Sequence, residues 1–88
     1  MESLLRKMVV DFNDYSELVA LNRAQKREGR NNDDVLEWNR GHLSCIEDYM
    51  EELAKELGYK LVYECGEHKF GFDDWARTLE YMTVRIEK

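Results

Sequence analysis

Two long segments with helical periodicity, separated by a few polar residues, constrain the fold of this chain more than any other feature. In the first segment, side chains suited to a helix–helix seam recur every three or four residues, at Leu5, Met8, Phe12, Tyr15, Val19 and Asn22. This spacing predicts a helix over about residues 2–28, with Gly29 in the position of a left-handed C-terminal cap. Polar, turn-forming residues follow at 30–32.

The second periodic segment covers residues 33–57. It begins with Asp33 and Asp34, which favour a helix N-terminus, and it ends before Gly58. On a helical wheel one apolar arc fills about half of the circle and is expected to face inward. This arc contains Val35, Leu36, Trp38, His42, Leu43, Cys45, Ile46, Tyr49, Met50, Leu53, Ala54 and Leu57. Gly41 lies on the polar side, where it weakens a helix by about 1 kcal/mol without leaving a gap in the apolar arc. One uninterrupted helix is therefore predicted.

Beyond Gly58 the periodicity drops to two residues. Residues 59–65 alternate as a strand, with Leu61, Tyr63 and Cys65 on one face. A turn is predicted at 66–69, and a short second strand at 69–72.

The C-terminal stretch has two interpretations. Residues 78–87 alternate as a strand, whereas a helix beginning after Asp73 would align Trp75, Leu79, Met82 and Ile86. We favour the strand, because the β-branched Thr83, Val84 and Ile86 are poor helix formers. Residues 1–88 are thus expected to form one α+β domain, in which a long antiparallel helical hairpin precedes a small antiparallel sheet of two or three strands.

The charge distribution narrows the classes of function. The chain carries a net charge of −6, which repels nucleic-acid phosphate and favours a protein partner with a basic surface over direct nucleic-acid binding. No stretch approaches the roughly 18 apolar residues of a membrane span, and no basic-then-apolar signal segment opens the chain. These features favour a soluble, cytoplasmic protein that does not bind membranes.

Carboxylates on the second predicted helix are the candidate partner-binding residues. They are Asp34, Glu37, Glu47, Asp48, Glu51 and Glu52. A row of carboxylates on a rigid helix is commonly only a solvated face, but it can also imitate a phosphate backbone. Trp75, near a predicted loop, is a candidate interface anchor. The leading hypothesis is a small acidic, non-enzymatic interaction module, in its most specific form an inhibitor that occupies a basic nucleic-acid-binding site, like accessory proteins of mobile elements.

The apolar residues also indicate self-association. The chain contains 2 Trp, 5 Tyr, 3 Phe and 4 Met, a large apolar surface for so small a fold to cover. Further apolar residues of the first helix lie outside its seam, namely Leu4, Val9, Val10, Leu18 and Leu21. Either a wrapped core or a homodimer interface would accommodate them, and a homodimer is expected.

The histidines and cysteines support an alternative function. His42-x-x-Cys45 on the second helix and Cys65-x-x-His68 after the first strand supply two imidazoles and two thiols, a known tetrahedral zinc set. A zinc-binding structural module is the alternative hypothesis. The competing interpretation, which we favour, is that both cysteines are buried thiols on inward faces and that the protein needs no cofactor. No motif for phosphate binding or nucleophilic catalysis is present, so an enzyme is not expected.

Overall fold

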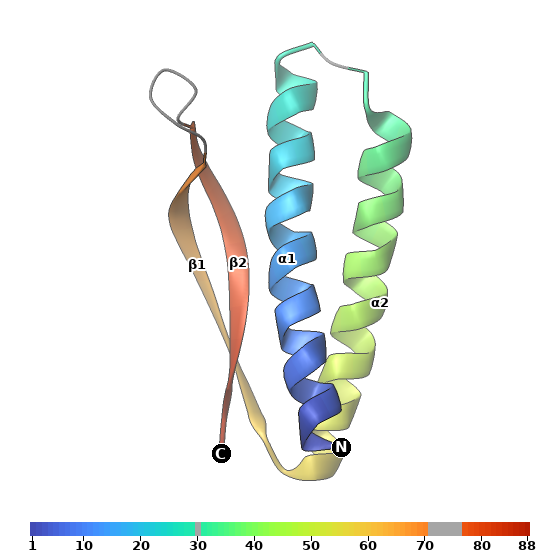
Figure 1. Cartoon of the computed structure of the whole chain (residues 1–88), viewed down its shortest axis with the longest axis vertical. Helices are drawn as coiled ribbons and strands as arrows, with labels where there is room; N and C mark the ends of the chain where they lie inside the picture. Colours follow the sequence, from blue (N-terminus) through green and yellow to red (C-terminus); the bar gives the residue numbers. More distant parts are fainter. Residues whose placement is uncertain (30, 71–76) are drawn as a thin grey trace.

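The computed structural model describes residues 1–29, 31–70 and 77–88, and the side chains of these residues except those at 68–70 and 77. Its elements are α1 (Glu2–Arg27), α2 (Asp33–Leu57), β1 (Lys60–Phe70) and β2 (Arg77–Glu87). The helices form a hairpin, and the strands form a two-stranded antiparallel sheet beside it (Figure 1). The predicted α+β fold with a helical hairpin is confirmed.

Both helices end where a glycine permits a left-handed backbone. Gly29, after α1, has φ of 89°, and Gly58, after α2, has φ of 76°. At the end of α2 the amide of Gly58 donates to the Lys55 carbonyl (3.3 Å), and that of Tyr59 donates to the Ala54 carbonyl (2.9 Å). These bonds satisfy carbonyls that the last helical turn would leave unpaired, and the glycine turns the chain into β1.

The strands differ from the sequence prediction in one respect. The expected turn at 66–69 and the separate strand at 69–72 are wrong as far as the structure describes them, because β1 runs without a break to Phe70. Gly66 pairs with Tyr81 and Glu67 with Glu80 in continuous register. The two-residue alternation of the strand therefore outweighs the turn propensity of Gly66. Residues 71 and 72 lie outside the described residues. From Arg77 onward the chain is a strand, not the alternative helix.

The core lies where the sheet meets the open end of the hairpin. Leu5 and Phe12 from α1 pack with Met50 from α2 and Val84 from β2. The Phe12 ring meets the Tyr63 ring edge to face, with 5.9 Å between centroids. The sheet lies on one side of the hairpin, and the molecule measures 43 × 27 × 17 Å. A fold this thin leaves parts of both helices without a covering layer.

Side chains of α1 also bind the outer backbone edge of β2. The amide group of Asn13 pairs with both backbone polar groups of Val84, and the Ser16 hydroxyl donates to the Met82 carbonyl at 2.6 Å. This edge of the sheet is thereby closed by a helix instead of a third strand.

Near the helical connection, a buried polar pair joins the two helices. The Asn39 amide donates to Asn22 Oδ1 at 2.7 Å, and both residues are buried. Asn32, in the connection, donates to the Asn22 carbonyl at 3.0 Å. A buried amide pair of this kind sets the register of two packed helices, because any slip would leave polar atoms unpaired.

Candidate interaction surface on the second helix

Helix α2 carries a charge equal to the net charge of the whole chain. Its basic residues are Arg40 and Lys55, and its acidic residues are Asp33, Asp34, Glu37, Glu47, Asp48, Glu51, Glu52 and Glu56. The helix is unbroken at Gly41, as its wheel predicts. From Asp34 to Glu52 the helix rises about 27 Å along its axis.

Five of the six candidate carboxylates are exposed, and four of these, those of Asp34, Glu37, Asp48 and Glu52, form no described hydrogen bond to the sheet. Glu37 forms an exposed ion pair with Arg40 at 3.5 Å, which solvent screening makes weak. Within the described part of the chain, Asp34, Asp48 and Glu52 form no ion pair. These three carboxylates are therefore not neutralised by the described cations of their own chain.

The other two candidate carboxylates have different surroundings. Glu51 accepts a hydrogen bond from the Tyr63 hydroxyl at 2.7 Å, on the side of α2 that faces β1. Burial, together with this hydrogen bond, raises the pKa of Tyr63. Glu47 is half-buried, and desolvation, reinforced by the charges of Glu51 and Asp48, raises the pKa of its carboxyl. The sheet thus divides the predicted acidic face into two sides.

An exposed apolar stripe runs along α2 next to the solvent-facing carboxylates. Val35, Trp38 and Tyr49 are 52%, 60% and 60% exposed. The sequence prediction that these residues face inward is wrong. Trp38 and Tyr49 lie toward one margin of the broad apolar arc, which α1 and the sheet leave uncovered. Val35 lies near the middle of the arc but at the start of α2, where it is also left exposed. Their spacing of three and four residues through His42 and Cys45 was the available signal for a second, separate stripe.

His42 is held within this stripe by aromatic rings. Its imidazole stacks on Tyr15 of α1, with 5.5 Å between centroids and 17° between planes. The Trp38 ring lies 3.8 Å from it at 59°. His42 is half-buried, so these contacts hold the stripe in place and leave Trp38 open to solvent.

The prediction of buried thiols is also wrong, because Cys45 and Cys65 are both exposed and free. Among the side chains that the structure describes, no three His, Cys, Asp or Glu come close enough together to hold a metal ion. The His68 side chain lies outside that set, and the zinc hypothesis, which needs it, stays a prediction. Trp75, the candidate anchor, also lies outside the described residues.

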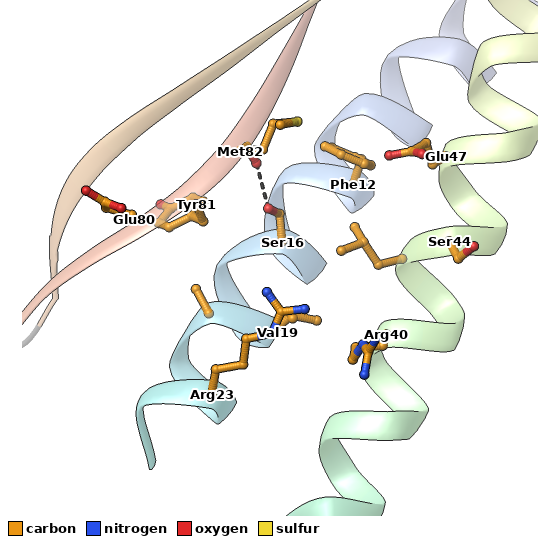
Figure 2. A pocket seen from close by; sticks show the side chains of 12 residues that line it. Phe12, Ser16, Val19, Arg23, Arg40, Ser44, Glu47, Glu80, Tyr81 and Met82 are labelled. Carbon is orange, nitrogen blue, oxygen red and sulfur yellow. Dashed lines mark hydrogen bonds between the residues drawn. The ribbon is translucent and has the colours of Figure 1, made fainter. Parts of the chain in front are cut away.

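A cleft of about 360 Å³ opens where the sheet diverges from the hairpin. Figure 2 shows Arg23 and Arg40 on neighbouring helices at one end of this cleft, and Glu80 on β2 at its far side. Glu47 also lines the cleft, so its lining contains two arginines and two glutamates. Such a balanced lining selects neither an anion nor a cation by charge.

Comparison of the chain with protein-family models, with curated proteins and with solved structures found no match. Within the described residues, neither helix is apolar enough to cross a lipid bilayer.

Proposed function

We propose that this chain is a small, non-enzymatic interaction module whose second helix binds a basic surface on another protein. The observation that carries this proposal is the concentration of charge on α2. Eight acidic residues and two basic residues lie along this one unbroken helix. The proposal includes a cytoplasmic location, where the two exposed thiols would stay reduced.

The composition of the surface supports binding and not solvation alone. A helix that needs only solubility exposes charged side chains, whereas α2 exposes Trp38 and Tyr49 beside Asp34, Asp48 and Glu52. Large aromatic side chains supply most of the energy of protein interfaces, and surrounding charges orient the partner and speed the encounter. The complementary surface is therefore apolar at its centre and rich in lysine or arginine around it.

The most specific form of the proposal is an inhibitor that covers a nucleic-acid-binding site of its partner. Lysines and arginines that bind phosphates also bind carboxylates, and a rigid helix presents carboxylates in a fixed row. The net charge of −6 argues against direct binding of DNA or RNA by the chain itself.

The test captures partners from host extract on the immobilised full chain and then adds duplex DNA. The expected result is a basic protein that is released by the duplex. A triple variant, Asp34→Asn, Asp48→Asn and Glu52→Gln, should lose the capture, because it removes the three carboxylates without a described ion partner.

The matched control neutralises three exposed carboxylates on other elements, by Asp14→Asn, Glu67→Gln and Glu80→Gln. It changes the net charge equally and should retain capture. If both variants lose capture to the same degree, general charge attraction explains binding, and α2 is not the docking surface.

A further inference from the structure

The two outer edges of the sheet differ in their hydrogen bonding. The outer edge of β2 is bound by Asn13 and Ser16 of α1. The outer edge of β1 is not bound in this way: within the described residues, no hydrogen bond is made by the outward backbone groups of Leu61, Tyr63, Cys65 and Glu67. Figure 1 shows the upper part of β1 as the outermost strand, on the side of β2 away from the helices.

The outward residues of β1 follow from the ladder geometry. In an antiparallel pair, residues alternate between those bonded to the partner strand and those whose amide and carbonyl point away from it. Val84 and Met82 use their backbone groups to bind α1, so they and their cross-strand partners, Tyr63 and Cys65, point away from the shared ladder. The unbonded edge is long, and β1 pairs with β2 without a bulge. The chain has no proline that could interrupt it.

We propose that this edge pairs with the same edge of a second copy of the chain, antiparallel and centred on Cys65, to form a continuous four-stranded sheet. This inference concerns a surface distinct from α2, and it does not depend on the proposed function.

Strand length and charge select both the partner and the register. Cys65 is the midpoint of β1 (Lys60–Phe70), so only the register centred on it pairs the whole strand with its whole copy. In that register Tyr63 faces Glu67 of the second copy. Registers centred on Glu64 or Glu67 would instead place like charges opposite each other, which is destabilising.

Charge also favours dimerisation through this edge over dimerisation through other surfaces of the chain. Over its length β1 carries two lysines and two glutamates, whereas α2 carries most of the acidic excess. Two copies therefore meet through nearly neutral strands and keep their acidic helices apart. The resulting dimer would present two α2 surfaces.

The test uses disulfide trapping, with one cysteine as the control for the other. At the proposed centre, Cα atoms of facing residues are about 5.5 Å apart, which a disulfide spans. The variant Cys45→Ser retains Cys65 and should give a covalent dimer on a non-reducing gel when copper phenanthroline and oxygen oxidise the thiols. The variant Cys65→Ser retains Cys45, which is also exposed, and should run as a monomer on the same gel. Equal trapping of both variants would overturn the proposal.

A second experiment avoids oxidation. Analytical ultracentrifugation in reducing buffer should show the wild-type chain as a dimer. The variant Glu67→Pro removes an outward amide hydrogen without touching the β1–β2 ladder, and it should weaken dimerisation about tenfold or more, because each copy loses a hydrogen bond. Glu67→Ala retains the amide and should dimerise as the wild type does. A wild-type chain that is monomeric up to about 100 μM, or equal dimerisation of both variants, would also overturn the proposal.

Discussion

Asn13 of α1 binds both backbone polar groups of Val84 in β2. Its Nδ2 donates to the Val84 carbonyl at 3.2 Å, and the Val84 amide donates to its Oδ1 at 2.8 Å. A side-chain amide thus occupies the position that a neighbouring strand would fill. This pair joins residues 71 positions apart in the sequence and attaches the C-terminal sheet to the N-terminal helix.

Replacing Asn13 should therefore loosen the sheet. Asn13→Ala leaves the Val84 amide and carbonyl without partners, and we expect the free energy of unfolding to fall by about 2 kcal/mol. Urea denaturation measures this loss, and hydrogen exchange should show faster exchange of the Val84 amide. Asp14→Ala, at the adjacent exposed position, should change stability by about 0.5 kcal/mol or less. Equal effects of the two substitutions would show that the Asn13–Val84 bonds are dispensable.

Gly41 within α2 and Gly58 directly after it should respond to alanine in opposite directions. Gly41 lies inside the helix, and no described atom beyond its own stretch of helix lies within 4 Å of the position of an added β-carbon. Gly41→Ala should raise the free energy of unfolding by about 1 kcal/mol. Gly58 has φ of 76°, so Gly58→Ala should lower it by about 1 kcal/mol or more. Thermal and urea denaturation measure both effects. Destabilisation by Gly41→Ala would contradict the unbroken helix.

The helical hairpin could be predicted from the sequence because local and periodic signals agree there. The seam from Leu5 to Asn22 has one phase, Gly29 and Gly58 mark the helix ends, and a short connection requires antiparallel neighbours. The sheet was predicted less well, because Gly66 was assigned to a turn although β1 continues through it. A glycine between alternating residues indicates a turn only where the chain needs a left-handed backbone, and Gly66 has no positive φ.

Exposure could not be predicted in the same way. A helical wheel identifies apolar residues but not how many neighbours the fold supplies to cover them. Trp38, Tyr49 and Cys45 lie at the margin of the arc, which two strands and one helix leave uncovered. The division of the acidic residues depends likewise on the path of β1, because Tyr63 reaches Glu51 from that strand.

Exposure of both cysteines predicts their reactivity. Cys45 and Cys65 are open to solvent in the folded chain, so a thiol reagent needs no unfolding step to reach them. Titration with Ellman's reagent in native buffer should modify both, at rates close to those in denaturant. Comparison of Cys45→Ser with Cys65→Ser assigns each rate. A cysteine that reacts only after denaturation would be buried in the folded chain, as the sequence analysis expected.

The raised pKa of Glu47 makes its ionisation unfavourable to folding. The folded chain holds this proton more tightly than the unfolded chain, so stability decreases as pH rises from the ordinary value of 4.5 through the raised pKa. Glu47→Gln removes this cost. Its melting temperature should exceed that of the wild type at pH 7, and the difference should shrink as the pH falls below 4.5. A difference that is independent of pH would indicate that changed packing, and not charge, is responsible.

Substitution of an exposed aromatic residue on α2 should affect binding but not stability. Trp38 is 60% exposed, so Trp38→Ala should change the free energy of unfolding by about 0.5 kcal/mol. An aromatic anchor at an interface contributes about 2 kcal/mol or more to binding. The same variant should therefore bind a captured partner at least tenfold more weakly. Val10→Ala, at a 56% exposed apolar position on α1, should leave affinity unchanged. Titration calorimetry with the purified partner measures both variants. Unchanged affinity for Trp38→Ala would remove the apolar part of the proposed surface, and binding would then depend on the carboxylates alone.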